Sequence, residues 1–208
     1  MVKRHQPLVH IPSICYDDLG DIEKDYIWKS FHYNPVLLKE TYPHVQIVQH
    51  KALRTAVRGM RLMKRRRHEY AIVDSINTFG LVSTVRGSEE SLAPILMTAH
   101  RDVAPAEPET LDWWEHPPFD AFYNKTDHFL WGRGASDKAA ITALVSAMEA
   151  LLSQETYQPR RSVIVALGSD EECSGNRGAG EISKYLEAEL EKAASLSFLM
   201  REAEAYKV

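Results

Sequence analysis

The strongest constraint on the fold is a strand–helix–strand pattern in the second half of the chain. Residues 94–99 form a short, nearly continuous apolar run, and residues 161–168 form a second. Runs of this length without polar alternation are typical of strands that are covered on both faces. The apolar residues between them have the spacing of an amphipathic helix and are Ile141, Leu144, Val145, Met148, Leu151 and Leu152. The pattern predicts an α/β fold in which residues 94–99 form an interior strand.

Further elements surround this unit. Residues 80–85 alternate apolar and β-branched side chains, which predicts a strand, and residues 181–194 have the apolar spacing of a helix. Prolines and scattered aromatic residues in residues 1–50 indicate a short helix framed by loops. Residues 101–134 are rich in turn formers, and a loop of this length in a compact domain is usually functional. We therefore expect an α/β domain with a mixed, largely parallel sheet flanked by helices.

The composition is that of an ordinary globular protein. Apolar residues make up 44%, charged residues 26%, and the formal net charge is −4, so no overall attraction to nucleic acid or acidic membranes is expected. The exception is the stretch from Lys51 to His68, which holds eight Lys or Arg residues and no acidic residue. A solvated helix face is the favoured interpretation. The alternatives are a nucleic-acid-binding arm and a nuclear-import signal.

Features that report on the cellular compartment are few. Cys15 and Cys173 are far apart and follow no paired spacing, so neither a disulfide framework nor a thiolate zinc site is expected. No apolar run reaches the roughly 18–20 residues that cross a bilayer, and residues 1–12 lack the apolar core of a secretory signal. These observations predict a cytosolic chain without a transmembrane segment. The tripeptide at 124–126, Asn-Lys-Thr, fits an N-glycosylation acceptor, which matters only on the secretory route.

Acidic and imidazole side chains follow the two apolar runs. His100 and Asp102 come after the first run, the acidic residues 170–172 come after the second, and Asp137 lies at the start of the helix. Ligands of α/β folds bind at the carboxyl ends of the strands, so we expect these groups to converge. Zinc favours imidazole and carboxylate ligands. Asp102 can accept the other ring N–H of His100, and one of two adjacent acids can serve as a general base.

Four stretches of the sequence carry a specific resemblance to a known family. They are Met-Thr-Ala-His-Arg-Asp-Val at 97–103, Trp-Glu-His-Pro-Pro-Phe at 114–119, Trp-Gly-Arg-Gly-Ala-Ser-Asp at 131–137 and Asp-Glu-Glu-Cys-Ser-Gly at 170–175. The chain resembles the dinuclear zinc exopeptidases of the aminoacylase and glutamate carboxypeptidase type, nearest to vacuolar carboxypeptidase S and the fungal Gly-X carboxypeptidases. The resemblance implies hydrolysis of a peptide or N-acyl amino acid bond by a water activated between two zinc ions.

The resemblance implies four metal ligands, which are His100, Asp137, Glu172 and Glu202. His100 and Glu172 would each bind one zinc ion, and Asp137 would bridge the two. Glu171 would act as the general base, and Asp102 would lie behind His100. The implied partners are a peptide or N-acyl amino acid substrate; no nucleic acid is expected, and the oligomeric state stays open.

The sequence also departs from the family pattern. Asp137 is followed at once by Lys138, where the family has one further residue, and the family's last histidine ligand and lid domain would follow Val208. We therefore expect the chain to bind zinc weakly and to hydrolyse little. The alternative is a catalytically inactive truncated fragment or pseudoenzyme, possibly a binding module. The expected organisation is an N-terminal segment of the catalytic domain at 1–50, a basic insertion at 51–70 and the front half of the catalytic domain at 71–208.

Overall fold

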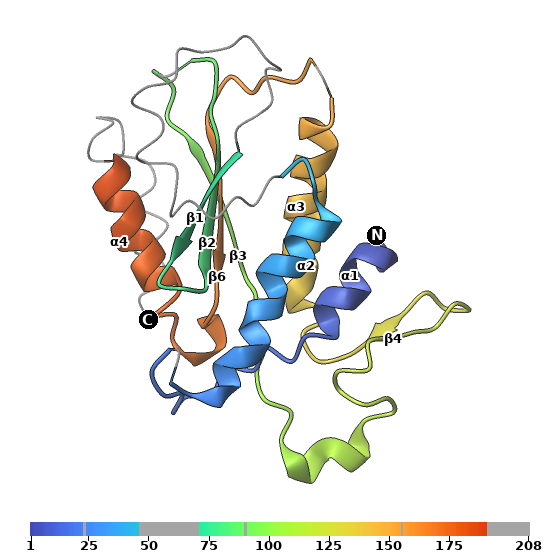
Figure 1. The fold of residues 1–208 in the computed structure, drawn as a ribbon. Coiled ribbons are helices and arrows are strands. Elements are labelled where there is room, and N and C mark those ends of the chain that lie inside the picture. The colour runs from blue at the N-terminus through green and yellow to red at the C-terminus, as the bar shows by residue number, and fades with distance from the viewer. Residues whose placement is uncertain (23, 46–70, 90, 155, 191–208) are drawn as a thin grey trace.

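The centre of the molecule is a four-stranded mixed sheet (Figure 1). The computed structural model describes residues 1–22, 24–45, 71–89, 91–154 and 156–190. The strands, in their order across the sheet, are β1 (Ala71–Ile76), β2 (Gly80–Val85), β6 (Val163–Gly168) and β3 (Ile95–His100). β2 is antiparallel to both of its neighbours, whereas β3 and β6 are parallel. The expected α/β class with a mixed sheet is confirmed. The described sheet is not largely parallel, because only β3 pairs in parallel, with β6, whereas β2 is antiparallel to β1 and β6.

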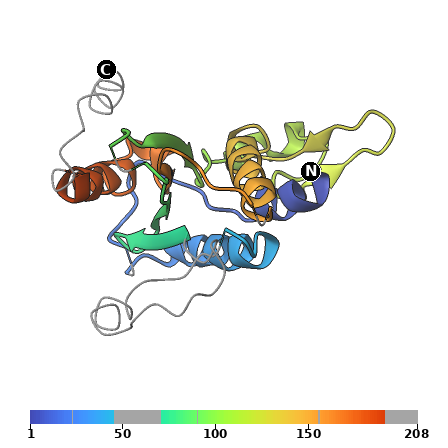
Figure 2. The ribbon, with the colours of Figure 1, turned by 90° about the horizontal axis from the view of Figure 1, so that it is seen from above.

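Helices cover both faces of this sheet (Figures 1 and 2). α2 (Tyr33–Thr41) and α3 (Asp137–Leu152) lie over one face, and α1 (Val2–Val9) contacts both of these helices. α4 (Ala179–Leu190) lies over the other face, against β1, β2 and β6. The helix expected after Asp137 is confirmed, and so is a helix in the region of 181–194.

Alternation along β6 explains how one strand serves two layers. Its residues at odd positions pack with α2 and α3, whereas those at even positions pack with Ile182 and Leu186 of α4. All five residues from Val163 to Leu167 are buried. Successive side chains of a strand point to opposite faces, so a strand covered on both sides must be apolar throughout. The interpretation of 161–168 as an interior strand is confirmed for β6.

The same interpretation is wrong for β3 within the described part of the chain. β3 lies at the end of the strand order, and its residues are half-buried or exposed; Ile95, for example, is 47% exposed. α3 contacts β3, and Met97 and Ala99 pack against the core beneath that helix. An apolar run of six residues predicts a strand that packs against apolar neighbours, but it does not distinguish an edge strand from a central strand.

The first fifty residues hold more helix than the single short one expected. Besides α1 and α2 there is a 3₁₀ helix, η1 (Tyr26–His32), whose first turn is capped by Asp25 Oδ1, which accepts the Ile27 N–H at 3.0 Å. Trp28 and Phe31 of η1 are buried and pack with Phe79. The scattered aromatic residues of this region therefore form a small core of their own.

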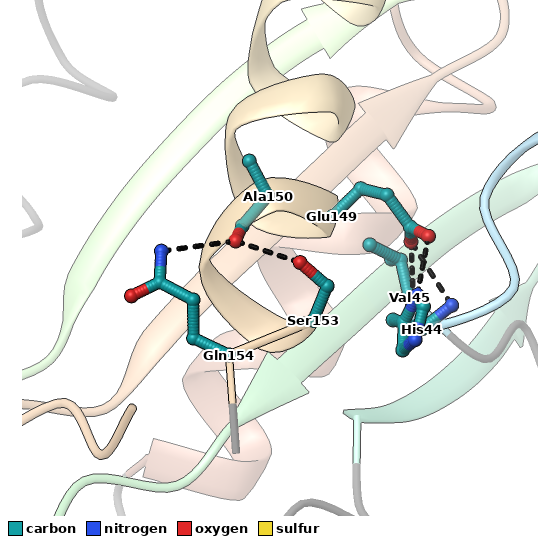
Figure 3. Close-up of polar contacts among 6 residues, drawn as sticks. All are labelled: His44, Val45, Glu149, Ala150, Ser153 and Gln154. Carbon is teal, nitrogen blue, oxygen red and sulfur yellow. Dashed lines mark hydrogen bonds and ion pairs between the residues drawn. The ribbon is translucent and has the colours of Figure 1, made fainter. Parts of the chain in front are cut away.

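A buried carboxylate fixes the chain where it approaches the basic stretch (Figure 3). Glu149 of α3 is 5% exposed and accepts the backbone N–H groups of His44 and Val45 at 2.9 and 3.0 Å. Its other oxygen lies 2.6 Å from Nδ1 of His44. The proposed basic insertion at 51–70 lies outside the described residues.

The long connection at 101–134 is ordered into small elements. It contains the 3₁₀ helix η2 (Pro108–Trp113) and a hairpin of β4 (Phe122–Tyr123) and β5 (Leu130–Trp131). The hairpin base is tied to α1 by the Gln6 amide, which donates to the Ala121 carbonyl at 2.9 Å. None of the described helices is long and apolar enough to cross a membrane.

Candidate metal centre

The parallel pair β3 and β6 brings two polar sets to one edge of the sheet. His100, the last residue of β3, is in register with Gly168, the last residue of β6. The short 3₁₀ helix η3 (Glu171–Cys173) follows β6 after a turn. Because parallel strands end at the same edge, His100 and the acids of η3 meet at the carboxyl end of the sheet.

His100, Glu171 and Glu172 form the one group of potential metal ligands found among the described residues. Each side chain offers a ligand atom, and these atoms all lie within 4.8 Å of one another. His100 Nε2 is 4.0 Å from Glu171 Oε2, and the side chains of His100 and Glu171 are 21% and 63% exposed. One imidazole and two carboxylates at this spacing are a donor set that suits a divalent cation such as zinc.

Asp102 lies behind this group and is fully buried. Its Oδ1 is 3.3 Å from His100 Nδ1, and its Oδ2 accepts the backbone N–H of Glu172 at 2.8 Å. The contact with Asp102 raises the pKa of His100, against the opposing effect of burial. Asp102 thereby holds one ring nitrogen of His100 and leaves Nε2 to face Glu171, which is the arrangement of a carboxylate that orients a metal-binding histidine.

The electrostatics of the group also suit a cation. Burial raises the pKa of Glu172, and the negative charges of Asp137, Asp102 and Glu171 raise it further. Several acids that disfavour one another's ionisation are stabilised together by a bound positive charge. The residues present therefore fit a divalent metal ion.

A buried acid, Asp170, shapes the loop that presents η3. Its carboxylate accepts the backbone N–H groups of Arg177 and Gly178 at 2.6 and 2.7 Å, and burial raises its pKa. A side chain at position 178 would overlap the Asp170 carboxylate and approach the Ser169 nitrogen to 2.7 Å, so only glycine fits there. No role of Asp170 was predicted from the sequence; the signal that could have pointed to it is Gly178, eight residues later.

Lys138, which directly follows Asp137, is buried against the N-terminal segment. Lys138 is fully buried, and its Nζ donates to the carbonyls of Leu8 and Ile11 at 2.9 and 2.6 Å. Burial lowers the pKa of Lys138 to about 7. The start of α3 is thereby tied to the N-terminal segment.

The predicted site residues are thus distributed as follows. His100, Glu171 and Glu172 lie together, with Asp102 directly behind them. Asp137 is half-buried at the first turn of α3 and is not a member of the 4.8 Å group, although its charge acts on Glu172. Glu202 lies outside the described residues.

The N-terminal segment contacts the elements that carry the candidate metal centre. Ile14 forms a parallel bridge with Val103, and the Cys15 N–H donates to the Val103 carbonyl at 3.0 Å. A disulfide joins Cys15 to Cys173, the residue after Glu172, with 5.8 Å between their Cα atoms. The expectation that the two cysteines would not pair is wrong. Their separation of 158 residues hid the pairing, since the fold rather than the sequence brings them together.

Comparison with known proteins identifies relatives of one kind. Residues 96–205 match the model of peptidase family M20/M25/M40. An uncharacterized carboxypeptidase of Schizosaccharomyces pombe is 35% identical over 177 residues, which cover 85% of this chain and 26% of that protein. Carboxypeptidase S of Saccharomyces cerevisiae is 39% identical over 120 residues, covering 57% of this chain and 21% of that protein. The chain therefore spans about a quarter of the length of these relatives.

Solved structures agree in fold. A structure titled as an M20 family metallo-carboxypeptidase from Sulfolobus solfataricus has a TM-score of 0.56 at 18% identity, covering 93% of this chain and 35% of the other. Human carnosine dipeptidase 1 has a TM-score of 0.57 at 16% identity, covering 92% of this chain and 35% of the other. The family match over more than half of the chain leads to one conclusion: this chain belongs to peptidase family M20/M25/M40, a family of metallopeptidases.

Proposed function

We propose that this chain carries the front half of a two-zinc hydrolase site for peptide or N-acyl amino acid bonds. The observation that carries the proposal is the grouping of His100, Glu171 and Glu172 within 4.8 Å, with Asp102 behind it. In this proposal His100 and Glu172 would each hold one zinc ion, Asp137 would be shared between the two, and Glu202 would be a further ligand. Residues 1–50 and 71–208 are assigned to the catalytic domain, and 51–70 to a basic insertion.

Glu171 is proposed as the general base. Its carboxylate is the most exposed of the group, at 63%, and so is accessible to a water and a substrate. When bound, zinc ions polarise a scissile carbonyl and lower the pKa of a coordinated water. Glu171 takes the proton of the attacking water on its carboxylate and delivers it to the leaving nitrogen. Asp102 keeps the His100 ring in place through both steps.

The substrate class rests on the relatives. Two of them are named carboxypeptidases, and a mouse relative named N-fatty-acyl-amino acid synthase/hydrolase is 43% identical over 120 residues, covering 57% of this chain and 22% of that protein. Both names describe an amide bond next to an amino acid. We infer that the scissile bond is an amide of this kind.

The test is a zinc titration of the full 208-residue chain against a competing chelator. The variants are His100→Ala, Glu172→Gln and Glu171→Gln, and the matched control is Glu109→Gln, an exposed acid of η2. We expect the first two to lower zinc affinity by about 10-fold or more, because each removes a ligand. Glu171→Gln should bind zinc within a few-fold of the unaltered chain but lose about 10²–10⁴-fold in any hydrolysis of an N-acyl dipeptide, as a general base does. Zinc binding that is indifferent to His100→Ala and Glu172→Gln would refute the proposal.

The competing candidate is a catalytically silent binding module. The direct Asp137–Lys138 junction favours it, because Lys138 is held by the N-terminal segment and Asp137 lies apart from the 4.8 Å group. A chain of this kind would bind zinc through His100 and Glu172 yet leave an N-acyl dipeptide intact. Hydrolysis that is lost on chelation and restored by zinc excludes it.

A further inference from the structure

An asparagine on the β4–β5 hairpin has the sequence and surroundings of a modification site. Of the four asparagines in the chain, only Asn124 is followed by Ser or Thr two positions later, and Lys125 between them is not proline. Asn124 directly follows β4, and its backbone N–H donates to the Phe129 carbonyl at 2.9 Å. Asn124 is half-buried, and all residues from 125 to 129 are exposed. The hairpin extends away from the sheet beside α1 (Figure 1).

Hydrogen bonds orient the side-chain amide of Asn124 but leave one of its N–H groups free of a side-chain partner in the turn. Its Oδ1 accepts the Thr126 N–H at 2.9 Å, and its Nδ2 donates to Asp127 Oδ2 at 2.9 Å. An amide nitrogen carries two hydrogens, and one of them is engaged by Asp127. Replacement of the other hydrogen by a sugar leaves the Asp127 hydrogen bond in place. The turn can therefore carry a glycan without being rebuilt.

An exposed aromatic ring lies across the hairpin from this amide. Phe129 is 64% exposed, which leaves a large apolar surface on the hairpin. Asn124 and Phe129 face each other through the backbone hydrogen bond, and residues opposite one another in an antiparallel pair have neighbouring side chains. The C–H face of a pyranose ring attached to Asn124 would remove apolar surface of Phe129 from water.

The disulfide is a second, independent observation that favours passage of the chain through the secretory route, where such a modification occurs. Disulfides form and persist in oxidising compartments and are rare in the cytosol. The Cys15–Cys173 bond is part of the fold, and Cys15 is 1% exposed. An oxidising compartment of a eukaryotic cell is also where asparagine is glycosylated.

We propose that Asn124 is the acceptor of an N-linked glycan whose first sugar covers Phe129. A bond forms between Asn124 Nδ2 and the anomeric carbon of a lipid-linked oligosaccharide diphosphate. The bond from that carbon to the diphosphate oxygen breaks, the lipid diphosphate leaves, and a base of the transferase takes the amide proton. The proposal is independent of the peptidase activity and replaces the expectation of a cytosolic chain.

The experiment expresses the full chain in yeast behind a cleavable secretory leader. The gel mobility of total and of secreted protein is compared before and after treatment with an amidase that removes N-linked glycans. Peptide mass spectrometry then shows whether Asn124 carries the glycan. The variants are Asn124→Gln and Thr126→Ala, which destroy the acceptor. The matched control is Thr126→Ser, which keeps it. Glycan transfer precedes folding, so variants retained in the cell are as informative as secreted ones.

The expected result is an enzyme-sensitive mobility shift in the unaltered chain and in Thr126→Ser, absent from Asn124→Gln and Thr126→Ala. An unmodified Asn124 in the unaltered chain would overturn the proposal. A second measurement tests the contact with Phe129. Loss of the glycan in Thr126→Ala, relative to Thr126→Ser, should lower the thermal midpoint by several degrees where Phe129 is present and leave it nearly unchanged in the Phe129→Ala background. An equal decrease in both backgrounds would overturn the packing of the sugar on Phe129.

Discussion

At the scale of single residues, the candidate metal centre depends on a side chain that is not itself a proposed ligand. Asp102 is buried and touches both His100 Nδ1 and the Glu172 backbone N–H, at 3.3 and 2.8 Å. One carboxylate thus contacts two proposed ligands, one at the end of β3 and one in η3. Only its contact with His100 was predicted from the sequence, because the second contact depends on how the loop after β6 folds back.

Asp102→Asn tests this double role. We expect zinc affinity to fall about 10–100-fold, as is typical when the partner of a metal-binding histidine is replaced. Asparagine keeps one oxygen for the Glu172 N–H, so the fold should persist, whereas its amide cannot supply the negative charge beside His100. The measurement is a chelator competition, with Asp112→Asn, an exposed acid of η2, as control. An affinity equal to that of the control would show that Asp102 has no part in metal binding.

His5 supports a prediction about pH. Its ring lies 2.8 Å from Thr142 Oγ1 and 2.8 Å from the Ala135 carbonyl, and burial lowers its pKa despite the hydrogen bond to Ala135. Because the folded state resists protonation, the unfolded chain takes up the proton first as the pH falls. The contribution of neutral His5 to stability is therefore full above about pH 6.5 and is lost as the pH falls through the lower folded-state pKa.

His5→Gln should accordingly weaken the dependence of stability on pH. Urea unfolding of both chains between about pH 8 and pH 5 gives the free energy of unfolding at each pH. The difference between the chains should be largest above about pH 6.5 and should shrink at acidic pH. A difference that stays constant over this range would contradict the prediction.

At the scale of elements, sequence periodicity predicted the centre of the domain better than its borders. β6 and α3 follow from patterns that tertiary packing reinforces, namely an apolar strand between two helix layers and a helix with one apolar face. The edge position of β3 was not predicted, and only one short helix was expected in residues 1–50, whose described part holds α1, η1 and α2. Strand order and 3₁₀ turns depend on contacts between distant segments, such as that of Trp28 with Phe79, which no local pattern encodes.

Glu149 joins two elements and gives a prediction at this scale. Glu149→Ala would leave the His44 and Val45 N–H groups without their acceptor, and a buried unsatisfied donor costs about 1–3 kcal/mol. We expect a loss of free energy of unfolding in that range, measured by urea denaturation. Gln154→Ala is the control, because Gln154 is an exposed residue just after the same helix that donates to the Ala150 carbonyl (Figure 3), and its loss should stay within about 0.5 kcal/mol. Equal losses in both variants would contradict the assignment.

At the scale of the whole molecule, the candidate metal centre is supported by segments from opposite ends of the described chain. Lys138 binds the Leu8 and Ile11 carbonyls, Cys15 pairs beside Val103, and the disulfide reaches η3. The ligand types were readable from the sequence because they follow predictable strands. The contacts that support these ligands could not be predicted from the sequence. Lys138 and Cys173 each bind a segment that is more than a hundred residues distant along the chain.

The disulfide therefore should contribute to both stability and metal binding. Closing a loop of 158 residues restricts the unfolded chain, and loss of such a bond typically costs about 2–5 kcal/mol. Cys173→Ser should lower the free energy of unfolding by that amount in non-reducing buffer. It should also weaken zinc binding, because Glu172 loses the covalent tether beside it. The double variant Cys15→Ser with Cys173→Ser should match the single one, since either change removes the same bond. In reducing buffer all three chains should converge, and a difference that persists there would assign the effect to side-chain packing rather than to the bond.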